Sequence, residues 1–187
     1  RVQKLHPDLQ SCVFETFSWD EVFPADGRFS YSRFRIGVNS VAIAGRDLKR
    51  LIAPQKLTPA AANASIFGLN GRLRALQHRL KAVATESRVR ASSRQFAHIA
   101  LRGAFACVMT TEQVYSEDFA TMAKYIALNL PERHATLNML VQLSVQGTPS
   151  TLEALAIVDD VMSWLPKFAE SWLDHNNPER DQTIKLV

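Results

Sequence analysis

Apolar residues spaced three and four positions apart occupy the middle of this 187-residue chain. This spacing places their side chains along one stripe of an α-helix, and such a stripe has to be buried against another surface. We favour the protein's own core as that surface, and the alternative is a coiled coil with another chain. The fold is therefore predicted to be mainly α-helical around the helix that carries Ile66, Leu69, Leu73, Leu76, Leu80 and Val83.

Capping residues and breaks divide the rest of the chain into further helices. Thr58 followed by Pro59 begins the helix that carries the stripe, because proline is favoured at the first helical position. The polar segment 85–94 is expected to be a break, and later helices are expected to begin at Ser92 or Ser93, Ser116, Pro131 and after 146–150. These boundaries predict an N-terminal arm (1–26), a basic region (27–90), an acidic helical region packed on it (91–173) and a C-terminal tail (174–187).

The segment GRFSYSRFRIGV, residues 27–38, alternates two sets of side chains. Successive side chains of a strand point to opposite faces, so each set would occupy one face of a strand. This pattern predicts one N-terminal β-strand, followed by a short helix over 41–53. The strand would place Phe34, Ile36 and Val38 on its apolar face and Tyr31, Arg33 and Arg35 on its exposed face.

Charge is strongly segregated along the chain. Residues 27–104 hold fifteen Lys and Arg against two acidic side chains, a net charge of +13, whereas 1–26 carries −3 and 105–187 carries −6. One explanation is that these arginines pair with acidic residues elsewhere in the fold. The other is that the region binds a polyanion, and phosphate is the usual partner because the guanidinium group matches its geometry. We favour a nucleic acid over a membrane surface, since the basic residues do not form one amphipathic helix.

Sequence motifs of enzymes and metal sites are absent. The chain has no Walker loop, GxSxG or GxGxxG, and none of its five histidines lies at metal-ligand spacing from another histidine or from a cysteine. We therefore expect a protein that is not an enzyme and that holds no metal and no cofactor. Two distant cysteines, Cys12 and Cys107, together with the lack of an apolar leader or membrane span, favour a cytoplasmic location.

A single strand leaves the hydrogen-bonding groups of its backbone without partners. The simplest solution is a homodimer in which two copies pair their strands into an antiparallel ribbon about a twofold axis. A two-stranded ribbon fits the major groove of B-DNA, so double-stranded DNA is the predicted partner.

The order of a strand (28–38), a short helix (41–53), a turn (54–58) and a longer helix (59–84) resembles the ribbon-helix-helix DNA-binding fold. With its larger size and basic, helix-rich body, the chain is similar to AcaB-like transcriptional regulators of conjugative plasmids. The resemblance implies a ribbon-helix-helix-like dimer core extended by additional C-terminal helices. It also implies a sequence-specific transcriptional regulator of conjugative-transfer genes, with RNA polymerase or another regulator as a further partner.

The resemblance further implies the residues of a DNA interface. Tyr31, Arg33 and Arg35 would read base edges in the major groove. Other residues would bind phosphate through their side chains or through backbone N–H groups at helix starts. These phosphate-binding residues would be Arg28, Asn39, Ser40, Lys49, Arg50, Lys56, Arg72 and Arg74.

Other functions remain open from the sequence. The main alternative is a non-enzymatic helical interaction or structural protein of a mobile element, whose basic region binds acidic partners. Such a protein would show no strongly salt-dependent binding to DNA. An RNA-binding protein is less favoured because no aromatic-rich sheet is evident, and an enzyme is the least favoured.

Overall fold

The computed structural model describes residues 16–27, 29–54, 56–82 and 85–182. Every regular element in these residues is a helix, so the predicted N-terminal strand and the ribbon-helix-helix core built on it are wrong. The chain divides into two compact units, Arg1–Ala53 and Pro54–Val187. Unit 1 contains α2 (Trp19–Val22), α3 (Tyr31–Asn39) and the 3₁₀ helix η1 (Leu48–Leu51). Unit 2 contains α4 (Pro59–Ile66), α5 (Leu69–Ala82), α6 (Glu86–Glu112), α7 (Phe119–Asn129), the 3₁₀ helix η2 (Pro131–Arg133), α8 (His134–Gln146) and α9 (Thr151–Asn176).

Most of the segment predicted as a strand forms the helix α3. Its first turn is capped by Ser30, whose hydroxyl accepts a hydrogen bond from the backbone N–H of Arg33 at 3.0 Å. Phe34 is completely buried within unit 1. Tyr31, Phe34 and Val38 are spaced by three and four positions, so these residues satisfy a helical period as well as an alternating one. The serine cap and the burial of Phe34 favour the helix over the strand.

The predicted helix over 41–53 is also wrong. Only Leu48–Leu51 forms a 3₁₀ turn, which begins at the capping side chain of Asp47. Val41 and Ile43, at the start of the predicted helix, are 88% and 98% exposed. A short helix in water is stable only when one apolar face packs against another part of the protein. Residues 41–46 are all exposed, so no such face is buried there.

Removal of the cap of α3 should loosen this helix. The Ser30 hydroxyl joins two elements, because it also donates a hydrogen bond to the backbone carbonyl of Glu21 in α2. We expect Ser30→Ala to destabilise α3 by about 1 kcal/mol, which is typical for a lost N-cap. Hydrogen exchange of the α3 amides in the full chain should then become roughly fivefold faster. Ser32→Ala on the same helix is the control, and equal acceleration in both variants would contradict a capping role for Ser30.

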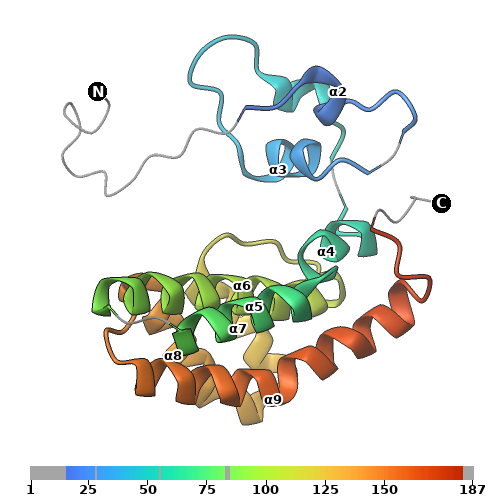
Figure 1. Ribbon diagram of the computed structural model, residues 1–187. Helices are drawn as coiled ribbons and strands as arrows, with labels where there is room; N and C mark the ends of the chain where they lie inside the picture. The colour runs from blue at the N-terminus through green and yellow to red at the C-terminus, as the bar shows by residue number, and fades with distance from the viewer. Residues whose placement is uncertain (1–15, 28, 55, 83–84, 183–187) are drawn as a thin grey trace. The chain divides into compact units, whose positions relative to one another are not determined.

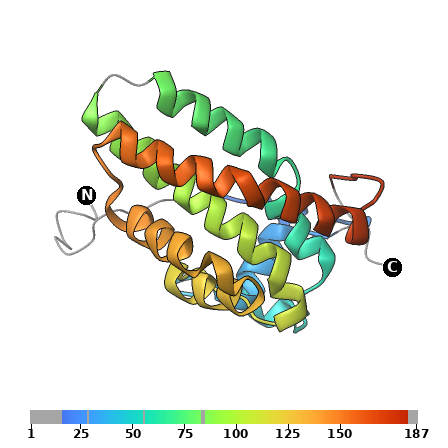
Figure 2. The same ribbon diagram turned by 90° about the horizontal axis from the view of Figure 1, so that it is seen from below.

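Helix α6 forms the centre of unit 2. It packs against α4, α5, α7, α8 and α9, and two perpendicular views show these helices arranged around it (Figures 1 and 2). Buried side chains such as Val89, Phe96, Leu101 and Phe105 point from α6 in several directions. A helix that is apolar on more than one side is typical of the buried centre of a bundle.

The polar break predicted at 85–94 is wrong, because α6 begins at Glu86 and continues through this segment. Ser92 and Ser93 are buried inside the helix instead of capping it. The Ser93 hydroxyl donates to the carbonyl of Arg90 at 3.0 Å and accepts from the backbone N–H of Thr148 at 3.1 Å. Serine is tolerated here because its hydroxyl has partners on both sides.

The apolar stripe in the middle of the chain faces the protein's own core. Its described members, Ile66 through Leu80, are at most 3% exposed, and α5 packs against α6 and α9. The stripe is divided between α4 and α5, because Gly68 adopts φ +68° and interrupts the helix. Val83 lies outside the described residues.

The segment that follows α9 is tied to α4 by buried asparagines. Asn177 donates from Nδ2 to Oδ1 of Asn63 at 3.0 Å, and Asn63 donates to the carbonyl oxygens of Asp181 and Gln182 at 3.1 Å each. Asn63 is 1% exposed and Asn177 is 5% exposed. The first part of the predicted C-terminal tail is therefore packed on unit 2.

Candidate nucleic-acid interface

The three residues predicted to read bases lie on α3 and do not share one face. Successive residues of an α-helix are about 100° apart, so Arg33 lies roughly 160° around the helix from Tyr31, whereas Arg35 lies roughly 40° from Tyr31. Tyr31 is 36% exposed, and both arginines are half-buried. The ribbon that would have presented these side chains together is not formed in the described residues.

Two predicted phosphate-binding residues lie at the wrong end of a helix for that role. Asn39 is the last residue of α3, and Ser40 is its C-cap. The Ser40 hydroxyl donates to the carbonyl of Ile36 at 2.6 Å. A helix C-terminus presents carbonyl oxygens and carries partial negative charge, so it disfavours a bound anion.

Three further candidates for phosphate binding are exposed basic side chains. Lys49 and Arg50 lie on η1 of unit 1, and Arg50 pairs with Asp47 at 3.3 Å. Lys56 belongs to unit 2 and is exposed. Arg28 lies outside the described residues. Lys49 and Arg50 thus belong to one unit and Lys56 to the other.

Arg72 and Arg74 on α5 are both engaged by groups of their own unit. One guanidinium nitrogen of Arg72 donates to the carbonyl oxygens of Ser65 and Phe67, at 2.5 and 3.3 Å. Arg72 thus caps the end of α4, and burial lowers its pKa from the usual arginine value. Arg74 donates to Oδ1 of Asn70 at 3.0 Å, which leaves most of its guanidinium donors available.

Acidic partners for the basic side chains of α5 and α6 are scarce. Arg102 pairs with Glu117 at 3.4 Å, and its guanidinium also lies over the ring of Phe119, 5.5 Å from the centroid. The other basic residues described in α5 and α6 form no ion pair within 4 Å with a described residue. These residues are Arg72, Arg74, Arg79, Lys81, Arg88, Arg90 and Arg94. Ion pairs among the described residues therefore do not account for the positive charge of α5 and α6, which together we call the basic hairpin.

Two of these arginines line one cleft between the end of α5 and the start of α6. The cleft has a volume of about 370 Å³ and is lined by Arg79, Arg88, Ala91 and Ser92. Arg79 donates to Oε1 of Gln95 at 3.2 Å, which holds one side of its guanidinium against α6. Its other N–H groups and the exposed guanidinium of Arg88 remain available to a ligand. We call this site the arginine cleft.

Sequence reasoning did not select Arg79 or Arg88 as site residues. They belong to different helices, and only the packing of α5 against α6 brings them to one cleft. The sequence feature that points to this region is the scarcity of acidic residues between Arg72 and Arg102, where Glu86 is the sole example. That signal identifies a basic hairpin but not which of its arginines converge.

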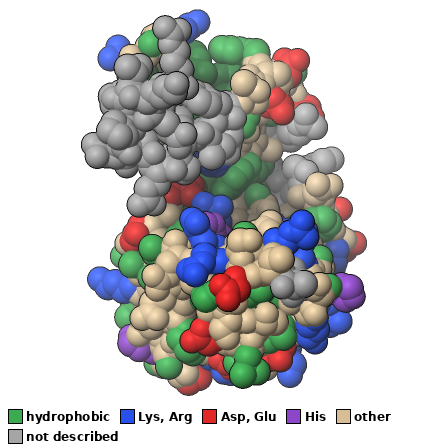
Figure 3. Space-filling view, turned by 60° about the vertical axis from the view of Figure 1, so that its left-hand side comes forward, with side chains coloured by type: hydrophobic (Ala, Val, Ile, Leu, Met, Phe, Trp, Pro, Cys, Tyr) green, Lys and Arg blue, Asp and Glu red, His purple; other side chains and the backbone are tan. Residues whose placement is uncertain are grey.

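On one face of the molecule the basic side chains lie in separate groups. On the face seen in Figure 3, Lys and Arg side chains lie among acidic, apolar and uncharged polar side chains and do not form one continuous area. Such a surface offers discrete positions for anionic groups. It differs from the broad basic face expected of an amphipathic helix that lies on a membrane.

Other kinds of chemistry find little support in the part of the chain that the structure describes. It contains no group of three His, Cys, Asp or Glu side chains arranged to hold a metal ion. Burial raises the pKa of the Cys107 thiol to about 12, so this thiol is protonated at neutral pH and is a poor nucleophile. None of the helices in these residues is both long and apolar enough to span a bilayer.

No family model, curated protein or solved structure matches this chain. The function proposed below therefore rests on the arginine cleft.

Proposed function

We propose that this protein is a DNA-binding regulator that contacts double-stranded DNA through the arginine cleft, with further contacts from the exposed basic residues of α5 and α6. The observation that carries the proposal is the convergence of Arg79 and Arg88 on one cleft without an ion pair to a described acidic residue. Regulation of conjugative-transfer genes stays a prediction from the sequence.

A phosphate group suits the arginine cleft for two physical reasons. Two cationic groups that share a cleft repel each other, and an anion between them replaces this repulsion with attraction. The planar guanidinium also donates two parallel hydrogen bonds to phosphate oxygens, which a lysine ammonium cannot do. Gln95 holds Arg79 in place, so less side-chain entropy is lost when the anion binds.

Contacts of this kind position a protein on DNA without reading its sequence. Arg74, Lys81 and Arg94 are exposed on the same two helices and extend the number of positions that a phosphate backbone can touch. Binding should therefore weaken steeply with added salt, because each neutralised phosphate releases bound counterions.

Neutralisation of the cleft tests the proposal. We expect the double variant Arg79→Gln/Arg88→Gln to bind duplex DNA more weakly, by a similar factor for unrelated sequences. The slope of log K against log salt should fall by about 2, since each lost phosphate contact removes about 0.9. Fluorescence anisotropy with a labelled random-sequence duplex, measured in the full chain at several salt concentrations, gives both quantities.

The matched control is Lys124→Gln/Lys167→Gln, which removes the same net charge from exposed positions on α7 and α9. It should change the salt slope far less than the cleft variant does. An equal effect of the two variants would mean that only net charge matters and that the cleft is not the contact site. A complete lack of DNA binding by the native chain at low salt would end the proposal.

A protein-interaction module is the second candidate function. Large apolar side chains are exposed in both units: Val41 and Ile43 in unit 1, and Val145 and Leu152 in unit 2, each at least 70% exposed. Exposed apolar side chains of this kind occur at protein interfaces. Under this function the basic hairpin binds an acidic protein, and an acidic polypeptide competes with DNA for binding at equal salt.

A further inference from the structure

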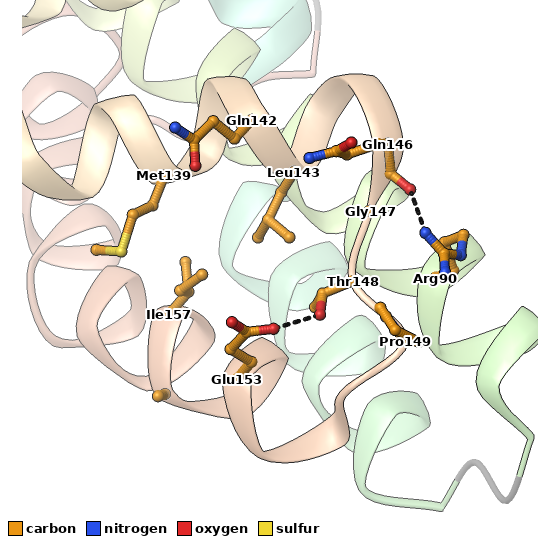
Figure 4. A pocket seen from close by; sticks show the side chains of 11 residues that line it. Arg90, Met139, Gln142, Leu143, Gln146, Gly147, Thr148, Pro149, Glu153 and Ile157 are labelled. Carbon is orange, nitrogen blue, oxygen red and sulfur yellow. Dashed lines mark hydrogen bonds between the residues drawn. The ribbon is translucent and has the colours of Figure 1, made fainter.

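Unit 2 contains a pocket of about 500 Å³ between α8 and α9 (Figure 4). Its volume falls in the range of about 300–1,000 Å³ that is typical of small-molecule sites. The walls come from α8, from the loop that joins it to α9, from the first turns of α9 and from Arg90 of α6. The pocket shares no lining residue with the arginine cleft.

The loop end of the pocket is held in place by contacts with α6. Gly147 adopts φ +63°, and a Cβ atom added to it would lie 2.3 Å from the carbonyl oxygen of Arg90. The guanidinium of Arg90 donates to the carbonyl of Gln146 at 3.4 Å, and the backbone N–H of Thr148 donates to Oγ of Ser93 at 3.1 Å. These contacts keep the pocket largely preformed, which reduces the entropy lost on binding a ligand.

The polar groups of the pocket carry both signs of charge. Oε2 of Glu153 accepts a hydrogen bond from Oγ1 of Thr148 at 2.5 Å, and Oε1 keeps its capacity to accept from a ligand. Arg90 uses one guanidinium nitrogen for Gln146, so further N–H groups remain. Gln142 and Gln146 add two amide groups one turn apart on α8 (Figure 4).

The other side of the pocket is apolar. Met139 and Leu143 from α8 face Ile157 from α9 across it, as Figure 4 shows. A ligand that extends from the charged groups to this wall would bury apolar surface and gain from the hydrophobic effect. The pocket therefore favours a molecule with a polar head and a short apolar chain.

We propose that this pocket binds a small zwitterion with an apolar side chain, of the class of the aliphatic α-amino acids. The ammonium group of the ligand donates to Oε1 of Glu153, and its carboxylate accepts from Arg90 and a neighbouring glutamine amide. The side chain lies against Met139, Leu143 and Ile157. A ligand with one charge alone would meet a like charge in the pocket, whereas a zwitterion satisfies both groups.

Three related probes test the proposal by isothermal titration calorimetry on the full chain. L-leucine carries both charges, 3-methylbutylamine lacks the carboxylate, and 4-methylpentanoic acid lacks the ammonium group. We expect saturable binding of L-leucine and at least about tenfold weaker binding of each analogue, since each lacks one set of charge-assisted hydrogen bonds. An absence of saturable binding by L-leucine, or equal binding of either analogue, would overturn the proposal.

Two variants locate the binding site. Glu153→Gln keeps an acceptor for Thr148 but removes the charge, and it should weaken L-leucine binding by about tenfold or more. Ala156→Phe places a ring in the pocket from an exposed position of α9 and should abolish binding. Glu170→Gln on the same helix is the control and should bind as the native chain does. Binding that survives both pocket variants would lie elsewhere and would contradict the assignment.

Discussion

Gly147→Ala should lower the free energy of unfolding of unit 2 by about 3 kcal/mol or more, because two costs add. The residue adopts φ +63° and ψ −178°, a backbone region that is essentially restricted to glycine and costs about 1–3 kcal/mol for other residues. The new Cβ atom would also lie 2.3 Å from a backbone carbonyl oxygen of α6, and this overpacking adds about 1–3 kcal/mol. The backbone oxygen cannot rotate away as a side chain can.

Urea unfolding followed by tryptophan fluorescence measures this effect. The full chain is used in a Trp19→Phe background, so that Trp164 and Trp172 of α9 report on unit 2 alone. The matched control is Gly71→Ala in α5, where a Cβ atom meets no other atom within 4 Å. That variant should be stabilised by up to about 1 kcal/mol, because alanine is the better helix former. A Gly147→Ala protein as stable as the Gly71→Ala protein would contradict the close contact between the α8–α9 loop and α6.

Leu73→Ala should destabilise unit 2 by about 3 kcal/mol, within the range of about 2–5 kcal/mol seen for buried leucines. Leu73 is completely buried in the middle of α5. Its truncation loses the transfer free energy of the removed carbons and leaves a cavity that the surrounding helices fill only in part. The same urea experiment measures the change.

Leu152→Ala is the matched control, because Leu152 is 82% exposed on α9. It should change the stability by less than about 0.5 kcal/mol. The destabilisation by Leu73→Ala should also be independent of protein concentration, since the apolar stripe faces the core of its own unit. A dependence on protein concentration would instead indicate that α5 packs against another chain.

Only part of the candidate site could be predicted from the sequence. Charge segregation predicted a basic region, and the structure leaves most basic side chains of α5 and α6 without an ion pair to a described residue. The particular residues were not predicted. Arg72 was predicted to bind phosphate, but one of its guanidinium nitrogens caps α4. Arg79 and Arg88, which were not predicted, line one cleft from two different helices. Convergence depends on how helices pack, and spacing along the chain does not contain it.

The error at α3 has a similar cause. The alternation from Phe29 to Ile36 and the spacing of Tyr31, Phe34 and Val38 are both present in the same segment. A short segment satisfies two periods equally well, so the choice falls to the cap at Ser30 and to the burial of Phe34. Once the helix forms, Tyr31 and Arg33 point to different sides.

Three features could be predicted from the amino-acid sequence alone: the apolar stripe from Ile66 to Leu80, the start of its first helix at Thr58 and Pro59, and the concentration of positive charge in residues 27–104. These features are local, because periodicity, caps and charge are properties of neighbouring residues. The identity of the central helix, the two arginines that share a cleft and the pocket between α8 and α9 became evident only from the packed helices. Those outcomes depend on contacts between residues far apart in the chain, and such contacts are set by packing among all the helices together.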